Sequence, residues 1–395
     1  MQEIRKYKSI REKFLPFCLP SIGQEEIQEV VTTLRSGWLT MGPKVKKFEE
    51  NFAKYAEATY AVAVSSCTAA LHLALVACDI KAGDEVITTP YTFAATAEAI
   101  LYVGAKPIFV DIDKNTFNIN VEKIEANITE RTKAIIPVHI AGQPCDMDKI
   151  VQIARKHKLW IIEDAAHALG ARYKGRKIGS IGHVTCFSFY PTKNITTGEG
   201  GMLTTNDAKI AQRVNTLRLH GISRDAWKRY TQYGSWHYEV IEVGFKYNMT
   251  DVQAAIGLHQ LKKLGEFQKI REKYAKMYND GFADLPEIVA PYVKKDVKHA
   301  WHLYIIKIRP ELLKINRNEF ISKLIAENIG VSVHFIPLHL HPYYKKTYDF
   351  KNGDFPNAEY VYERVISLPL YPGMTMHDIE DVIYAVRKVV TTYRK

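Results

Sequence analysis

The chain contains 395 residues, 47% of them hydrophobic, and carries a formal net charge of +11. This length favours two domains rather than one core, and no apolar run or signal-peptide pattern points to a membrane partner. The positive charge suits an anionic small substrate, since no nucleic-acid-binding motif accompanies it, and five cysteines without CxxC spacing indicate reduced cytoplasmic thiols rather than disulfides or a zinc site.

The first part of the chain predicts an arm followed by two helices. Residues 1–24 begin with a cluster of basic side chains and are interpreted as an N-terminal arm. Helices are predicted over residues 24–34 and 43–55, separated by the Ser36-Gly37-Trp38 break. One face of the first helix is apolar, with Ile27, Val30, Val31 and Leu34.

From residue 60 onward, strand-like and helical patterns alternate. The apolar runs of strand length cover residues 61–65, 85–89, 107–112, 134–140, 159–163, 184–189 and 202–205. The helical patterns between them cover residues 68–78, 93–103, 121–128 and 147–157. This alternation predicts an α/β fold with a mostly parallel seven-stranded sheet covered by helices on both faces. The last two runs are joined by a glycine-rich turn, which predicts antiparallel pairing there.

The pattern changes after residue 265. We therefore divide the chain after the arm into a large domain of residues 25–265 and a smaller C-terminal α+β domain of residues 266–395. The smaller domain is predicted to contain helices over 267–285, 317–328 and 377–390, and strands over 301–308 and 331–335.

Lys193 follows the strand predicted over residues 184–189 and precedes a turn with Gly198, Gly200 and Gly201. A lysine at the end of an apolar run is poorly placed for solvation. Burial lowers the pKa of such an amine and makes it a nucleophile toward carbonyl groups. The alternative is a solvated loop lysine, which is the commoner situation.

Asp164 directly follows the strand predicted over residues 159–163 and is followed by Ala165-Ala166-His167. A carboxylate at the mouth of a sheet can pair with a cationic ring nitrogen and keep it protonated. The alternative is an N-cap for the next segment. Asp164 precedes Lys193 by 29 residues, about one strand-crossover unit, so we expect both side chains at one sheet edge.

Ser65-Ser66-Cys67-Thr68 follows a strand and opens a helix. Free N–H groups at a helix N-terminus bind phosphate, although simple capping by serine or threonine is the alternative. Ser188 alternates with its apolar neighbours Phe187 and Phe189, so its hydroxyl is expected to face a ligand. A nucleoside-triphosphate loop is excluded, because no G-x-x-x-x-G-K-[ST] motif occurs.

Two further stretches are less specific. Tyr91 lies at a strand end, where an aromatic ring can stack on a flat ligand but is more often part of the core. His334, His339 and His341 have no carboxylate or cysteine at ligand spacing. We therefore expect these histidines to form a polar wall of a substrate cleft rather than a metal site.

In combination, these stretches resemble the DegT/StrS-type sugar-nucleotide aminotransferases, which are pyridoxal-phosphate enzymes of the type I, aspartate aminotransferase fold. The resemblance covers about residues 15–390. Within the family, residues 131–139 and 367–370 are similar to members that aminate UDP-4-keto-arabinose. The stretches that carry the family resemblance are Ser36-Gly37-Trp38, Gly42-Pro43, Ser66 to His72, Thr92-Phe93, Glu163 to His167, Ser188 to Lys193, Gly198 to Gly201 and Tyr247 to Asp251.

The resemblance implies a role for each matching residue at a pyridoxal 5'-phosphate site. Lys193 would be the Schiff-base lysine, Asp164 would pair with the pyridine nitrogen, and His167 would lie near the phenolic oxygen. Phe93 would stack on the ring. The remaining cofactor contacts would hold the phosphate: Cys67, Thr68 and Ser188.

The resemblance also implies a homodimer with shared active sites, because Asn248 would reach the phosphate of the neighbouring subunit's cofactor. Capping of the helix that starts near Thr250 is the alternative for Asn248. Arg229 matches a basic loop position that would meet the nucleotide diphosphate. The other substrate contacts expected are Trp38, Tyr91 and His334.

The implied reaction moves an amino group from L-glutamate, leaving 2-oxoglutarate, to a keto sugar on a nucleotide diphosphate. C4 and UDP are favoured, and the product would serve cell-surface polysaccharide or lipopolysaccharide. One alternative is another enzyme on the same cofactor, such as a sugar dehydratase or an amino-acid transaminase. Lys193 argues against the dehydratase branch, which has histidine at that position. The other alternative is a non-catalytic regulator on the same fold.

Overall fold

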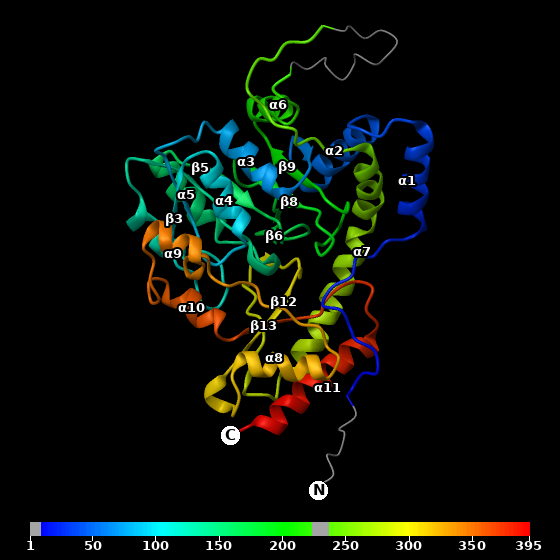
Figure 1. The fold of residues 1–395 in the computed structure, drawn as a ribbon, viewed down its shortest axis with the longest axis vertical. Coiled ribbons are helices and arrows are strands. Elements are labelled where there is room, and N and C mark those ends of the chain that lie inside the picture. Colours follow the sequence, from blue (N-terminus) through cyan, green and yellow to red (C-terminus); the bar gives the residue numbers. More distant parts are fainter. Residues whose placement is uncertain (1–8, 223–236) are drawn as a thin grey trace.

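The computed structural model describes residues 9–222 and 237–395. Figure 1 shows a large sheet with its helices in the upper part and a smaller C-terminal part below, with helix α7 running along both. No helix within the described ranges combines the length and the apolar character needed to cross a bilayer. All five cysteines are free thiols.

The large sheet has seven strands in the order β1-β9-β8-β5-β4-β2-β3. Strand β9 is antiparallel to both of its neighbours, and the pairs from β8 to β3 are parallel. The α/β fold and the expected antiparallel pairing are thus confirmed. The strands are β1 (Tyr60–Val64), β2 (Glu85–Thr88), β3 (Lys106–Phe109), β4 (Thr132–Ile135), β5 (Trp160–Asp164), β8 (Val184–Ser188) and β9 (Gly201–Thr205).

Both faces of this sheet are buried, and successive side chains on a strand enter different clusters. On β5, Ile161 belongs to one cluster and Ile162 to the other. The Ile161 face packs against α2 (Pro43–Ala56), α5 (Met147–His157) and the first half of α7 (Asp251–Phe282). The Ile162 face packs against α3 (Cys67–Ala77), α4 (Ala94–Tyr102) and α6 (Ala208–Leu217).

The second half of α7 belongs to a different core. Leu264 and Phe267 pack in the large-sheet cluster, whereas Tyr274 and Tyr278 pack in the C-terminal cluster. The domain boundary at residue 265 stays a prediction, and the helix passes through it without a break. The C-terminal core also contains β10 (Ile288–Val289), β12 (Tyr304–Ile308), β13 (Val365–Leu368), α8 (Arg317–Ala326) and α11 (Met376–Tyr393).

Shorter elements complete the structure. Besides the C-terminal sheet, which has the order β10-β12-β13, a third sheet with the order β11-β6-β7 joins the C-terminal segment to the large part. Its strands are β11 (Val297–Lys298), β6 (Arg172–Tyr173) and β7 (Arg176–Lys177). The remaining α-helices are α1 (Gln24–Ser36), α9 (Pro342–Tyr348) and α10 (Pro356–Tyr362).

Three predicted elements were wrong. The helix expected over residues 121–128 is two 3₁₀ turns, Val121–Lys123 and Glu125–Asn127. The Asn127 side chain donates to the Lys123 carbonyl at 2.9 Å, so a side chain satisfies a group that a longer helix would use. The strand expected over 331–335 is reduced to one bridge between Ser332 and Ser367.

The helix predicted from residue 267 actually begins at Asp251. Thr250 and Gln253 form a reciprocal capping box at its start. Gly265 does not end it, because one glycine costs about 1 kcal/mol in a helix interior and the packed face outweighs that cost. Gly257 has a packing reason, since a Cβ there would lie 2.7 Å from the Phe48 ring.

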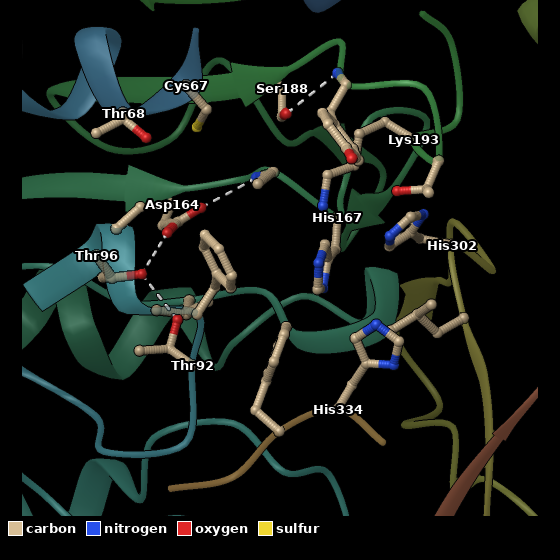
Figure 2. Close-up of a pocket in the computed structure, with 18 of the residues that line it drawn as sticks. Cys67, Thr68, Thr92, Thr96, Asp164, His167, Ser188, Lys193, His302 and His334 are labelled. Atoms are coloured by element: carbon tan, nitrogen blue, oxygen red, sulfur yellow. Dashed lines mark hydrogen bonds between the residues drawn. The ribbon is translucent and has the colours of Figure 1, made fainter. Parts of the chain in front are cut away.

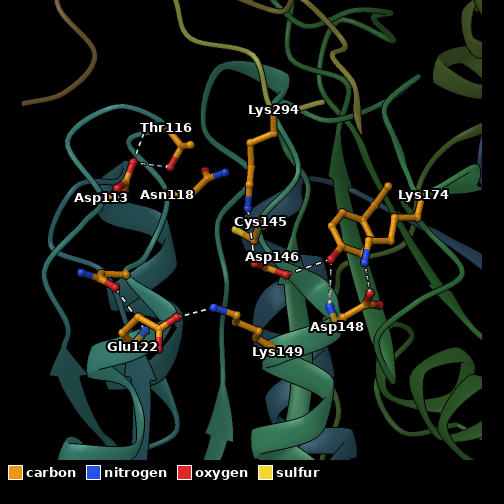
Figure 3. A network of polar contacts seen from close by, with 12 residues as sticks. Asp113, Thr116, Asn118, Glu122, Cys145, Asp146, Asp148, Lys149, Lys174 and Lys294 are labelled. Atoms are coloured by element: carbon orange, nitrogen blue, oxygen red, sulfur yellow. Dashed lines mark hydrogen bonds and ion pairs between the residues drawn. The ribbon is translucent and has the colours of Figure 1, made fainter. Parts of the chain in front are cut away.

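A polar network surrounds the first turn of α5 (Figure 3). Asp146 accepts a hydrogen bond of 2.8 Å from the Tyr173 hydroxyl and pairs with Lys294 at 3.3 Å. Asn118 accepts the N–H of Ile140 at 3.0 Å, and its amide donates to the Gln143 carbonyl. These contacts fix the loop of residues 138–145, which lies beside the carboxyl end of β5.

Candidate active site

A cavity of about 540 Å³ lies beyond the carboxyl ends of β5 and β8 (Figure 2). Both Asp164 and Lys193 line it, as expected for two groups at one sheet edge. Its walls combine residues after β2, β5 and β8 with His302, His334 and Phe335 of the C-terminal part. The cavity is therefore formed between the two cores.

Lys193 lies in the loop that connects β8 to β9. The base of this loop is closed by a hydrogen bond of 2.9 Å from the Phe189 N–H to the Gly200 carbonyl. The next residue, Asn194, donates 2.8 Å to the Ala300 carbonyl and ties the loop to the C-terminal part. Burial lowers the pKa of Lys193 to about 8. A substantial fraction of this amine is therefore neutral near physiological pH.

Asp164 faces the cavity from the end of β5. Its carboxylate accepts 2.7 Å from Thr96 Oγ1 and 3.1 Å from the Ala166 N–H. Burial raises the pKa of Asp164, while these two donors and the Lys193 charge act in the opposite direction. The carboxylate is thus held in one orientation, and a cationic partner would lower its pKa.

The N-terminus of α3 forms another wall of the cavity. Ser66 Oγ accepts a hydrogen bond of 3.0 Å from the third residue of the helix. The N–H groups of Cys67 and Thr68 have no acceptor within residues 9–222 and 237–395. A Cβ on Gly201 would lie 2.5 Å from the Ser66 carbonyl, so only glycine lets β9 approach this turn. Together with Ser188, these groups form a corner of hydrogen-bond donors that is suited to an anion.

Three neutral histidines face the same space. His167 Nδ1 accepts 3.3 Å from the Ala141 N–H, and its ring centroid lies 4.3 Å from that of His302. His334 Nδ1 lies 2.8 Å from Ser367 Oγ. Burial lowers the pKa of all three imidazoles, that of His334 to about 4. Each imidazole is therefore neutral and can offer one donor and one acceptor nitrogen to a ligand.

Aromatic rings form the rim of the cavity. Phe93 is 65% exposed, and its ring centroid lies 6.2 Å from that of Phe335. Phe335 stacks on His167 with a centroid distance of 5.8 Å, and Phe17 from the N-terminal arm stacks on His334 at 5.5 Å. A flat ligand can lie against such a rim.

Two predicted substrate contacts do not line this cavity. Tyr91 was predicted wrongly, because its ring is fully buried in a separate cluster and its hydroxyl donates to the His334 carbonyl. Trp38 lies elsewhere and donates from Nε1 to the Met41 carbonyl at 3.3 Å. Arg229 falls outside the described residues. Asn248 pairs with Val64 outside the cavity, and its role in the neighbouring subunit stays a prediction.

The three C-terminal histidines do not form the shared wall that we predicted. Only His334 reaches the cavity. His339 is buried and lies 2.9 Å from Glu359, and His341 is the residue before α9. Within the described ranges, no group of three histidine, cysteine or acidic side chains is arranged to hold a metal ion.

Sequence reasoning missed several residues that line the cavity, including Thr96, His302, Phe335 and Phe17. Thr96 had a detectable signal, because it lies one helical turn after Thr92 at the start of a helix that follows a strand. The others come from the arm and the C-terminal part. No local pattern marks them, since only the tertiary fold brings them to the sheet edge.

Comparison with known proteins places this geometry in context. Residues 20–387 match the DegT/DnrJ/EryC1/StrS aminotransferase family. The spore coat polysaccharide biosynthesis protein SpsC of Bacillus subtilis is 55% identical over 96% of this chain and 98% of its own. The UDP-4-amino-4-deoxy-L-arabinose–oxoglutarate aminotransferase of Shewanella sediminis is 43% identical over 96% of this chain and 98% of its own.

Solved structures of sugar aminotransferases have the same fold. A putative sugar aminotransferase from Streptococcus pneumoniae, in its PMP form, superposes with a TM-score of 0.90 at 36% identity. The alignment covers 96% of this chain and 99% of that one. Its PLP form superposes equally well, with a TM-score of 0.90 at 35% identity and the same coverage.

Proposed function

The chain belongs to the DegT/DnrJ/EryC1/StrS aminotransferase family, and on that premise we propose that it transfers the amino group of L-glutamate to C4 of a UDP-linked keto sugar. As a member it is a pyridoxal-phosphate-dependent sugar aminotransferase. The observation that carries the proposal is the pair of Lys193 and Asp164 on one cavity, with the corner of hydrogen-bond donors beside them. The substrate itself is suggested by the name of the Shewanella sediminis relative.

The residues present fit pyridoxal phosphate. Its phosphate requires N–H donors, which the unpartnered groups of Cys67 and Thr68 offer next to Gly201. Its ring requires an apolar face and a carboxylate, which Phe93 and Asp164 offer. We assign these residues, together with Ser188 and His167, as the cofactor contacts.

Bound pyridoxal phosphate supplies a carbonyl that condenses with amines and a ring that accepts electrons. Asp164 would keep a proton on the ring nitrogen, because its buried carboxylate favours a positive neighbour. His167 would donate from Nε2 to the phenolic oxygen. The N–H of Ala141 occupies its Nδ1, so the neutral ring carries its proton on Nε2.

Lys193 performs the proton transfers in this scheme. A pKa of about 8 leaves the amine able to take the α-proton of the amino donor on Nζ and to return it at a neighbouring carbon. The Lys193 loop is tied at both ends, which limits the positions of Nζ. Phe17, Phe93 and Phe335 restrict the entry of water from the rim.

We further propose a homodimer in which Asn248 and Arg229 serve the neighbouring active site. Helix α1 supports association, since Ile27 and Leu34 on its apolar face are 48% and 53% exposed in the single chain. The substrate contact expected of Trp38 stays a prediction. The cytoplasmic location expected from the unpaired thiols stays a prediction.

The test is a panel of keto sugar nucleotides that varies the nucleotide and places the keto group at C3 or C4. With L-glutamate as donor, we expect 2-oxoglutarate to form in equal amount to the amino sugar, with nitrogen at C4 by NMR. Amination at C3, or preference for another nucleotide, would replace the substrate assignment. Loss of a sugar hydroxyl without nitrogen transfer would favour the dehydratase alternative.

A further inference from the structure

Glu163 directly precedes Asp164 on β5 and is completely buried. Because strand side chains alternate, Asp164 points toward α4 while Glu163 points to the opposite face of the sheet. A fully buried glutamate is rare unless it is paired. Glu163 takes no part in the proton transfers proposed for Lys193, Asp164 and His167.

The Glu163 carboxylate receives three donors. Oε1 accepts 2.6 Å from the Gly182 N–H and 2.9 Å from Thr185 Oγ1. Oε2 lies 2.8 Å from His139 Nε2. A carboxylate with two or three such donors is held in its ionised form. Glu163 therefore carries a negative charge inside the sheet.

The His139 proton lies on the Glu163 side of the ring. The backbone N–H of Cys145 donates to His139 Nδ1 at 3.0 Å, so Nδ1 has a lone pair and Nε2–H donates to Glu163. Burial lowers the pKa of His139, but Cys145 and Glu163 raise it by more, so its pKa lies above the ordinary value. The hydrogen bond from the Cys145 N–H nevertheless favours the neutral ring, because a second proton would have to occupy Nδ1.

Few other titratable groups face Glu163. His183, whose pKa is lowered by burial, accepts the Ile161 N–H at Nδ1 and is also neutral. The Cys186 thiol is buried with a pKa well above its usual value. Among the described residues, the ion-pair partner of Glu163 is His139, and no lysine or arginine pairs with it. With His139 neutral, no positive charge cancels the negative charge of Glu163.

The same loop also fixes the backbone of Asp164. The His139 N–H donates to the Asp164 carbonyl at 3.1 Å, and the Asp164 N–H donates to the Pro137 carbonyl at 2.9 Å. His139 thus contacts Glu163 through its side chain and Asp164 through its backbone. This arrangement couples the two acidic residues.

We propose that Glu163 is a positioning residue for Asp164, and that its buried negative charge raises the proton affinity of the cofactor held there. The inference rests on the proposed role of Asp164 at the ring nitrogen. Glu163 touches neither substrate nor cofactor. It acts by holding the β5 backbone at Asp164 and by the electrostatic field of its carboxylate. A negative charge at this depth is weakly screened, so its effect reaches the neighbouring cation.

The experiment compares the parent with Glu163→Gln, which removes the charge with little change of shape. The primary measurement is the pH midpoint of the visible absorbance band of bound pyridoxal phosphate. Removal of a negative charge disfavours nearby cations, so we expect the midpoint to fall by about 0.5 to 1 pH unit. We also expect kcat to decrease about tenfold with little change in KM.

Matched variants separate charge from packing. Glu85→Gln removes another buried carboxylate, held by Arg131 and Thr129 at the opposite end of the sheet, and should leave the midpoint unchanged. Glu163→Asp keeps the charge and should retain most of the parent midpoint even if thermal stability falls. A midpoint that moves equally in Glu85→Gln would overturn the inference.

Asp164→Asn in the same assay separates the proposed role of Asp164 from the inference about Glu163. If Asp164→Asn leaves the midpoint unchanged, the proposed role of Asp164 fails. If Asp164→Asn moves it but Glu163→Gln does not, only the Glu163 inference fails. Should Glu163→Gln not fold, ¹⁵N-histidine NMR of the parent provides the test, since a doubly protonated His139 at pH 7 would cancel the charge and contradict the inference.

Discussion

Thr96 Oγ1 donates a hydrogen bond of 2.7 Å to Oδ2 of Asp164, and both side chains are buried. Thr92 Oγ1 lies 2.7 Å from Thr96 Oγ1, which extends the contact to the residue before Phe93. The first turn of α4 is therefore bound to the carboxylate at the end of β5 (Figure 2). The Asp164 carboxylate and Phe93 of the aromatic rim are therefore held by the same hydrogen-bonded turn.

Thr96→Val should weaken both the fold and the cofactor site. The change leaves a buried carboxylate oxygen without its donor, so we expect the free energy of unfolding to fall by about 1–3 kcal/mol. The Kd for pyridoxal phosphate should rise several-fold. The control is Thr88→Val, since Thr88 is a buried threonine on β2 that donates to the Ile136 carbonyl at 2.9 Å. Equal losses of cofactor affinity in both variants would remove Thr96 from the site.

Lys193→Ala should leave the fold intact and abolish amino transfer. Pyridoxal phosphate should still bind through the remaining contacts, but without the absorbance of the covalent adduct with the lysine. Lys177→Ala is the matched control, because Lys177 is also half-buried but contacts the Tyr55 carbonyl away from the cavity. Turnover and the absorbance spectrum measure the two effects, and near-parental turnover in Lys193→Ala would rule out the assignment.

The reaction of cofactor-free protein with pyridoxal phosphate should follow the neutral Lys193 amine. Burial lowers the pKa from its ordinary 10.5 to about 8, so the rate should rise with pH and level off above about pH 8.5. The same shift means that the unfolded chain binds more protons between pH 8 and 10.5. The contribution of Lys193 to stability therefore increases with pH across that window. A rate that still rises through pH 10 would show an ordinary solvated amine.

Asn248 is tested by complementation between subunits. Lys193→Ala and Asn248→Ala proteins, each inactive or nearly so, are mixed under conditions that exchange subunits. If Asn248 acts in the neighbouring site, a mixed dimer regains one site with both native residues, up to about half of the parent activity for that species. Proven exchange without recovery would leave Asn248 with a local role, consistent with its hydrogen bond of 3.4 Å to the Met249 carbonyl.

The sequence predicted the large sheet well because its signal is local and repeated. Each buried strand is a short apolar run, and the stretches that follow β1, β5 and β8 at the carboxyl edge contain polar residues that line the cavity. Asp164 and Lys193 could be assigned to that edge because parallel topology brings strand ends together. The same reasoning predicted that the helix N-terminus at Cys67 and Thr68 lies at this edge, and both residues line the cavity.

The remaining parts depend on contacts that no local pattern encodes. Tyr91 follows a strand end as Phe93 does, yet one ring enters a core and the other stays exposed. Only the packing of the C-terminal part decides between them, since Tyr91 bonds to the His334 carbonyl. Likewise, the long helix continues through Gly265 because its buried face, not its local propensity, determines where it ends.

Helix α7 spans 32 residues, which is about 48 Å at the usual rise per residue. Its first half is packed into one core and its second half into the other. Because the helix is continuous, unfolding of either half would destabilise the other half and expose apolar surface of the core that it covers. Heat denaturation of the cofactor-free chain should therefore give a single calorimetric transition rather than two separate ones.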